Sequence, residues 1–152
     1  MFRTSTGRAL DLGLLVLRAV IGAIFVAHGA QKLFVFGIAG VTGGFESMGV
    51  PLAGVMGPAV ALTEFLGGIT LIAGLLTRVT GVALAGIMLG AALLVHLPAG
   101  FFLPNGYEFV LVLMAGAGAL ALTGAGAFSV DALIARRADS ADVVPVSTRR
   151  VA

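Results

Sequence analysis

Long apolar stretches dominate this chain and constrain its fold more than any other feature. Four of them come close to or exceed the roughly 20 residues that a helix needs to cross a hydrocarbon core. They cover approximately residues 12–36, 52–76, 79–97 and 107–128. Of the 152 residues, 59% are hydrophobic and 11% are charged, whereas soluble domains have about 45–50% and 25%. A domain this small could not hide so much apolar surface from water. We therefore predict an all-α membrane protein, an antiparallel up-down bundle of four transmembrane helices.

The first apolar stretch carries Arg18, His28 and Lys32, yet its length still fits a membrane. In a helix, the Cα atoms of Arg18 and Lys32 would lie about 21 Å apart along the axis. Because long basic side chains extend toward the headgroups, their charges would bracket about 30 Å, the thickness of a hydrocarbon core. The arginine inside the apolar region and the lack of a small-residue cleavage site argue against a signal peptide. We therefore retain this stretch as a span.

The connection between the second and third stretches is very short. Only Thr77 and Arg78 separate the two stretches, so the two helices should form an antiparallel pair. On the third stretch, Gly86-x-x-x-Gly90 has the spacing at which membrane helices pack closely through small residues. We expect this face to be a packing surface.

Basic residues outside the apolar stretches predict the orientation. Under a four-span arrangement, seven arginines fall on one side of the membrane: Arg3, Arg8, Arg78, Arg136, Arg137, Arg149 and Arg150. The predicted loops on the other side, 37–51 and 98–106, contain no Lys or Arg. Because cytoplasmic loops are enriched in Lys and Arg, both termini should be cytoplasmic. We expect a multi-pass protein of the plasma (inner) membrane.

The sequence changes character after the fourth stretch. Ser129 and Asp131 are typical of a helix start and predict a short helix over residues 130–137. Residues 138–152 are polar and lack periodicity, so we expect a disordered cytoplasmic tail. No repeat or second domain is visible, and we assign residues 1–135 to a single transmembrane domain.

Ionisable residues inside the spans are candidates for function, because charge is costly in lipid. They are Arg18, His28, Lys32, Glu64, His96 and Glu108. The predicted helix directions place all except Arg18 between the membrane midplane and the outer surface. On the first helix, Arg18, His28 and Lys32 fall within an arc of about 80° at 100° per residue. We expect a shared polar pocket in the outer half of the bundle.

Each candidate also has a structural interpretation. Arg18 and Lys32 could be anchors at the membrane surface, and His96 and Glu108 could be ordinary interfacial residues. His28 could be a neutral histidine bonded to a carbonyl. Glu64 is harder to explain in this way, because it lies far from either end of its span. Burial would favour a neutral carboxyl unless Arg18, His28 or Lys32 pairs with it.

Several kinds of site are absent from the sequence. The chain has no cysteine, which excludes disulfides, thiol catalysis and Cys-ligated zinc or iron–sulfur clusters. Two histidines without thiols or a close carboxylate pair make a poor ligand set, so we predict no metal site. No phosphate loop, nucleophile triad or dinucleotide motif is present. We predict no covalently or motif-bound cofactor and no nucleic-acid partner.

Four motifs resemble the DoxX family of small bacterial four-helix membrane proteins. They are R-x-x-x-G-x-x-F-x-x-H-G-x-x-K from Arg18, E-x-x-G-G-x-x-L-x-x-G with a following T-R from Glu64, H-x-x-x-G-F then N-G-Y-E from His96, and G-x-G-x-x-S-x-D from Gly124. They occur in the family's order and cover the chain up to about residue 135. Each motif alone is short, but the four together are fairly specific.

The resemblance implies a redox context. Some DoxX members look like subunits of membrane oxidoreductases, including a thiosulfate–quinone oxidoreductase. Others are linked to quinone or oxidative-stress responses, or to membrane complexes with thiol enzymes and superoxide dismutase. The family's characteristic polar positions match the six ionisable residues selected above by depth, which supports a shared site without defining its chemistry.

We therefore expect a subunit of a quinone-linked membrane redox complex that takes electrons from a protein partner. Glu64 and His28 would exchange protons, and the quinone would be bound by Arg18, Lys32, His96, Asn105 and Glu108. Two alternatives remain open: a non-catalytic anchor that assembles redox or detoxifying enzymes, and a small transporter. Whether the chain is an enzyme and whether it forms a homo-oligomer are also left open.

Overall fold

The computed structural model describes residues 5–141, and all regular structure in that range is helical. The elements are α1 (Ser5–Ala30), a π-helix (Gln31–Phe36), α2 (Gly37–Ser47), α3 (Ala53–Ala73), α4 (Thr77–Ala91), a second π-helix (Ala92–His96), a 3-10 turn (Leu97–Ala99), α5 (Glu108–Thr123) and α6 (Val130–Ala141). The predicted all-α class is confirmed for this part of the chain.

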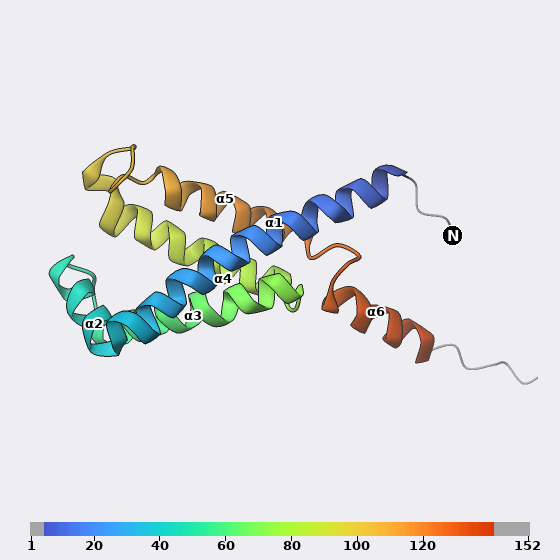
Figure 1. Cartoon of the computed structure of the whole chain (residues 1–152), viewed down its shortest axis with the longest axis horizontal. Helices are drawn as coiled ribbons and strands as arrows, with labels where there is room; N and C mark the ends of the chain where they lie inside the picture. The colour runs from blue at the N-terminus through green and yellow to red at the C-terminus, as the bar shows by residue number, and fades with distance from the viewer. Residues whose placement is uncertain (1–4, 142–152) are drawn as a thin grey trace, which may run out of the picture.

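The bundle has two different ends (Figure 1). We call the end that carries the start of α1, the α3–α4 turn and α6 the terminal end. The end that carries α2 and residues 97–107 is the loop end. The start of α1 and helix α6 lie at the same end (Figure 1).

Three helical segments are long and apolar enough to cross a membrane. They are Thr6–Ser47, Ala53–Ala73 and Thr77–Ala99, and the apolar α5 (Glu108–Thr123) is shorter. These segments fit a membrane helical bundle. The fourth predicted stretch, 107–128, ends earlier than expected because Gly124 and Gly126 adopt positive φ angles of 82° and 73°, which a continuing helix cannot contain.

The predicted loop over residues 37–51 is mostly helix α2, so this part of the prediction is wrong. The segment was predicted as a loop because it lies between two apolar stretches, and its glycines at positions 40, 43 and 44 are poor helix formers. Packing against α3 overrides that preference: Val41 is buried, and its side chain lies where a Cβ on Gly57 would meet it at 3.3 Å.

Two other boundaries differ from the prediction. The α3–α4 turn lies at residues 74–76 and not at Thr77-Arg78, because Gly74 adopts a positive φ of 68° and α4 already begins at Thr77. The two helices are adjacent and antiparallel, as predicted, and the Thr70 and Thr80 hydroxyls are 3.1 Å apart. Helix α6 continues to Ala141, beyond the predicted end at residue 137. The rest of the predicted tail, 142–152, lies outside the described residues.

Glycines pack the helices into two close pairs. Between α1 and α3, a Cβ on Gly22 would lie 2.7 Å from the Gly68 carbonyl oxygen, and one on Gly29 would lie 2.4 Å from the Phe65 amide nitrogen. Between α4 and α5, a Cβ on Gly81 would lie 2.7 Å from the Ala117 carbonyl oxygen. Backbone contact through small residues is typical of membrane helix packing.

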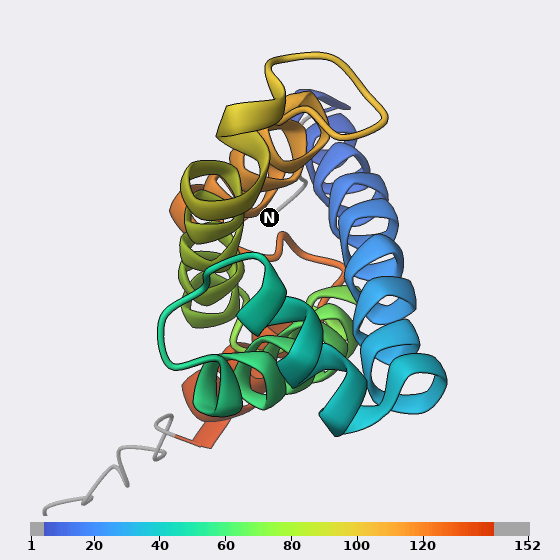
Figure 2. The same cartoon turned by 90° about the vertical axis from the view of Figure 1, so that its left-hand side faces the viewer.

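The predicted packing role of Gly86-x-x-x-Gly90 is wrong within this chain. A Cβ on either glycine would have no atom within 4 Å. The reason is that the α1–α3 and α4–α5 pairs meet near the terminal end and separate toward the loop end (Figures 1 and 2). Both glycines therefore border a space between the pairs and do not touch another helix.

Candidate functional site

A cavity of about 680 Å³ lies between the two helix pairs at the loop end. Most of its lining is apolar and comes from α1 to α5 and from residues 97–107. The polar side chains in the lining are those of His28, Lys32, Glu64 and His96. Ligand pockets in proteins typically have this size and this mixture of apolar walls with a few polar groups. Four of the six ionisable candidates are thus brought together.

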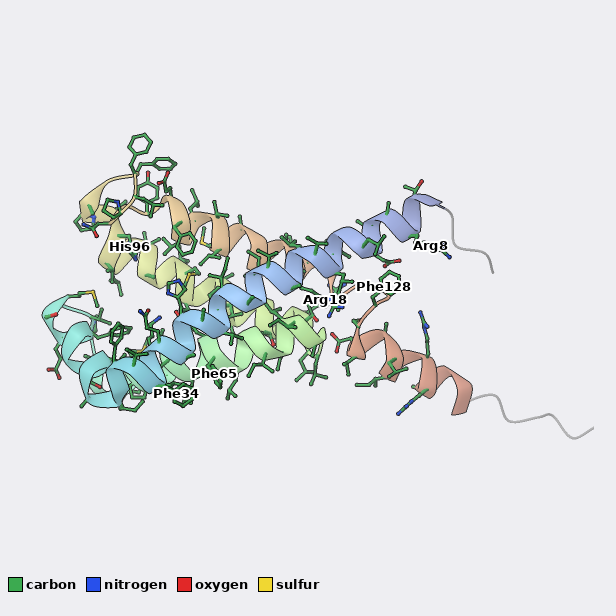
Figure 3. All side chains as sticks on the ribbon, viewed as in Figure 1. Arg8, Arg18, Phe34, Phe65, His96 and Phe128 are labelled. Atoms are coloured by element: carbon green, nitrogen blue, oxygen red, sulfur yellow. The ribbon has the colours of Figure 1, made fainter. Side chains whose placement is uncertain are left out.

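Lys32 and Glu64 form an ion pair that links the π-helix after α1 to α3 on the cavity wall. Glu64 is only 3% exposed, so its carboxylate depends on this partner for charge compensation. The sequence left three possible partners open, and the structure selects Lys32. The nearby Phe34 and Phe65 rings contact edge-to-face, with centroids 5.6 Å apart, and join the same two helices (Figure 3).

His28 lies one helical turn before Lys32 and also lines the cavity. Its ring contacts the ring of Phe109 at a centroid distance of 5.9 Å, which connects α1 to the first turn of α5. His28 is exposed and is one of the residues that line the cavity. It is therefore placed to exchange a proton with a molecule in the cavity.

His96 lies on the opposite side of the cavity, at the end of the second π-helix (Figure 3). Its Nδ1 is 2.8 Å from the backbone carbonyl oxygen of Asn105. The Glu108 carboxylate accepts a hydrogen bond from the Leu103 amide at 2.8 Å. Asn105 and Glu108 are not part of the cavity lining. In this structure they organise the loop that covers the cavity.

Arg18 lies at the other end of the bundle, near Phe128 (Figure 3). It is 2% exposed and donates hydrogen bonds to the carbonyl oxygens of Ile72, at 2.9 Å, and Phe128. It does not line the cavity. The structure thus separates Arg18 from the quinone-binding group to which the sequence assigned it, and gives it contacts that hold the fold together.

Two acidic residues outside the six ionisable candidates also bond to backbone groups at the terminal end. The Asp11 carboxylate accepts a hydrogen bond from the Ala127 amide at 2.9 Å. The Asp131 carboxylate accepts from the amides of Leu76 and Thr77, at 2.8 and 3.0 Å, and thereby caps the start of α4. Ser129 caps α6 as predicted, accepting from the Ala132 amide at 3.1 Å. Asp131 proves to cap a different helix.

Both π-helices border the cavity, and neither was predicted from the sequence. Gln31–Phe36 contains Lys32, and Ala92–His96 contains His96. Such segments are rare and often occur at functional sites. Within residues 5–141, no group of three or more His, Asp or Glu side chains is placed to hold a metal ion. What the cavity offers is an ion pair and two imidazoles between apolar walls.

Comparison with known proteins places this arrangement in a family. The DoxX family model matches residues 13–97. The chain is 37% identical over 133 residues to "Inner membrane protein YqjF" of Escherichia coli strain K12, with 84% of this chain and 95% of the relative covered. The chain belongs to the DoxX family. The predicted family resemblance is therefore confirmed, and with the apolar helices it confirms a multi-pass membrane protein.

Two further relatives of this DoxX protein come from Bacillus subtilis and Mycobacterium tuberculosis. "Putative oxidoreductase CatD" of Bacillus subtilis strain 168 is 34% identical over 127 residues, and the alignment covers 84% of this chain and 90% of the relative. "Uncharacterized membrane protein Rv3486" of Mycobacterium tuberculosis strain ATCC 25618 / H37Rv is 31% identical over 133 residues, and the alignment covers 80% of this chain and 81% of the relative. No solved structure matches the chain.

Proposed function

We propose that this DoxX protein is a subunit of a quinone-linked redox complex in the plasma membrane, and that the cavity binds the quinone ring. The observation that carries the proposal is the Lys32–Glu64 ion pair beside His28 in an otherwise apolar cavity of about 680 Å³. The name of the relative CatD contains the word oxidoreductase, which agrees with a redox role.

The residues that line the cavity fit a quinone ring. The Lys32 ammonium donates a hydrogen bond to a ring carbonyl oxygen, and the apolar walls contact the ring faces. Glu64 and His28 carry protons between the ring oxygens and the loop end. A general acid–base group must lie within hydrogen-bond reach of the proton that it transfers, and both side chains line the cavity. A bound quinone supplies two-electron, two-proton redox chemistry. This chain has no thiol, and the electrons come from a partner subunit that carries a redox centre.

We further propose four membrane spans with the terminal end in the cytoplasm. Four arginines lie at that end: Arg8, Arg78, Arg136 and Arg137. Within residues 5–141, the one Lys or Arg at the loop end is Lys32, which is paired with Glu64. Cytoplasmic positive charge sets membrane orientation. With 16 residues, α5 is about 24 Å long, and a thinner bilayer around a short helix accommodates such a mismatch.

The test is Glu64→Gln in the complex that co-purifies with the native chain. We expect the variant to fold and keep its partner but to lose quinone reduction by at least about 100-fold, typical of removing a proton-transfer group. Thr63→Ser, on the same helix and outside the cavity lining, is the control. Absence of quinone from the purified native protein, together with unchanged activity of Glu64→Gln, would refute the proposal.

A second candidate is a non-catalytic anchor for a soluble enzyme, which helix α6 favours. This helix projects from the terminal end (Figure 1), with Leu133 and Ile134 about half exposed beside Arg136 and Arg137. Replacing Leu133 and Ile134 by serine should then release the partner. An anchor role alone predicts that Glu64→Gln leaves the partner's activity intact, which separates the two candidates.

A further inference from the structure

On one side of the cavity, the neighbouring helices α3 and α4 touch near the terminal end and separate toward the loop end. Resting on the proposed quinone function, we propose that the quinone enters from the lipid between α3 and α4, and that its isoprenoid chain stays in this cleft against Gly86 and Gly90. The same contacts make the site selective for quinones that carry a long chain.

Contacts between α3 and α4 near the terminal end fix their register. The Thr70 and Thr80 hydroxyls are 3.1 Å apart, and a Cβ on Gly67 would lie 3.3 Å from Leu84. In an antiparallel pair, this register places Gly86 roughly level with Glu64 and Gly90 roughly level with Val60. All four residues line the cavity. The cleft thus begins at the depth of the ion pair.

Beyond that depth α3 and α4 face each other across open space. A Cβ on Gly86 or Gly90 would have no atom within 4 Å. Both glycines nevertheless line the cavity, as do residues of α3. Farther toward the loop end, Met56 on α3 and Leu94 on the following π-helix are both exposed and both line the cavity. Figure 1 shows the two helices moving apart in this direction.

On the opposite side of the cavity, contacts between α1 and α5 continue farther toward the loop end. A Cβ on Gly116 would lie 2.8 Å from Ile21, and farther toward the loop end the His28 and Phe109 rings are in contact. Phe25, between these two points on α1, is 1% exposed. An apolar chain attached to a ring at Lys32 and Glu64 therefore leaves toward α3 and α4.

The loop end of the cavity is covered. Phe45 and Met48 contribute to its lining from α2 and the residue after it, and Leu103 and Pro104 from the loop before α5. Val41 packs against Gly57 and holds α2 on α3. An apolar chain would meet this cover in one direction and the closed α1–α5 side in another, while the cleft leads to lipid.

The ion pair argues for a ligand with a polar head and against a helix from a second copy of the chain. An apolar transmembrane helix in the cleft would complete the burial of the Lys32–Glu64 pair and leave the other N–H groups of the Lys32 ammonium without an acceptor, which is costly. A quinone ring offers carbonyl oxygens at that depth, and its chain matches the apolar cleft walls. A second copy is therefore the less favourable occupant.

The experiment compares Gly86→Leu with Gly118→Leu in the full-length protein in nanodiscs. Position 118 on α5 is also open, with nothing within 4 Å of a Cβ, but lies outside the cavity lining. Both variants should therefore fold, and both replace a helical glycine by leucine. Two probes are used: a ubiquinone with a full isoprenoid chain, and the same dimethoxy-methyl-benzoquinone ring without a chain. Quinone retained per protein and ligand-induced thermal stabilisation are measured.

We expect Gly86→Leu to retain at least about tenfold less long-chain quinone, equivalent to about 1.4 kcal/mol, because the new side chain fills the path of the isoprenoid chain. Its stabilisation by the chain-free ring should fall much less, because that ring binds at Lys32 and Glu64 on the other helix pair. All results for Gly118→Leu should match the native protein. Equal retention of the long-chain quinone in both variants would refute the entry route.

Three further results would also be decisive. Loss of both probes in Gly86→Leu would refute the cleft as the path of the chain, since residue 86 would then contact the ring itself. A halved mass of the native assembly in Gly86→Leu would show that a second copy occupies the cleft. Failure of both probes to bind the native protein would instead refute the proposed quinone function.

Discussion

The two ends of the bundle handle buried charge in opposite ways. At the terminal end, Arg18, Asp11 and the partly buried Asp131 bond mainly to backbone groups of residues 72–77 and 127–128. At the loop end, Lys32 and Glu64 bond to each other, and His28 and His96 face a cavity.

This difference separates structural charges from candidate functional ones. Helix ends and turns leave amides and carbonyls without partners, and the terminal-end charges supply those partners where the helices converge. Charges at the loop end lie where the helices diverge and π-helices interrupt the regular hydrogen bonding. They can therefore interact with a bound molecule. Four substitutions test this comparison.

Arg18→Met should have the largest effect on stability. It leaves the Ile72 and Phe128 carbonyls without their charged donor, which should lower the free energy of unfolding by about 3–4 kcal/mol. Thermal unfolding in detergent measures this, with Arg18→Lys as a control that keeps one donor and loses about half as much. Quinone binding by the folded fraction should be unchanged. Normal stability with lost quinone binding would instead place Arg18 in the site.

Gly68→Ala should come next, because its new methyl would lie 2.6 Å from the Gly22 carbonyl oxygen. Overpacking of this kind costs about 2–3 kcal/mol. Gly86→Ala is the matched variant in open space, and there the methyl should stabilise α4 slightly, by about 0.5 kcal/mol. The melting temperatures of the two variants should therefore shift in opposite directions. Equal destabilisation would show that Gly86 is packed against another helix.

Lys32→Gln should have a smaller effect. It leaves the Glu64 carboxylate without its partner, and we expect a loss of about 2 kcal/mol, less than in fully enclosed pairs because the cavity borders the pair. The double variant Lys32→Gln/Glu64→Gln removes both charges and should recover most of the stability, but not quinone binding. A double variant no more stable than Lys32→Gln alone would argue against charge pairing at this site.

Asp131→Ala should have the smallest effect, about 1 kcal/mol, because it removes a helix cap from the partly exposed start of α4. The Leu76 and Thr77 amides should then exchange their hydrogens faster, with little change around Glu64. Hydrogen-exchange mass spectrometry resolves these two regions. Faster exchange at both would indicate that the ends of the bundle are coupled.

The sequence alone established the environment and much of the architecture of this protein. Apolar stretches of spanning length require lipid, whatever their neighbours, so the all-α membrane class followed without tertiary information. The motifs from Arg18 to Asp131 identified the family. The unusual position of Glu64 far from both ends of its helix was visible in the same way, and a buried charge needs a partner in any fold.

Only the tertiary structure decided which charges meet and which glycines touch. Arg18 and Lys32 lie near one face of α1 in the sequence pattern, yet one bonds to backbone carbonyls at the terminal end and the other to Glu64 at the cavity. Gly68 and Gly86 look equally suited to packing, but one is in close contact and the other faces open space. The physical reason is the divergence of the two helix pairs, which depends on crossing angles that no local pattern encodes.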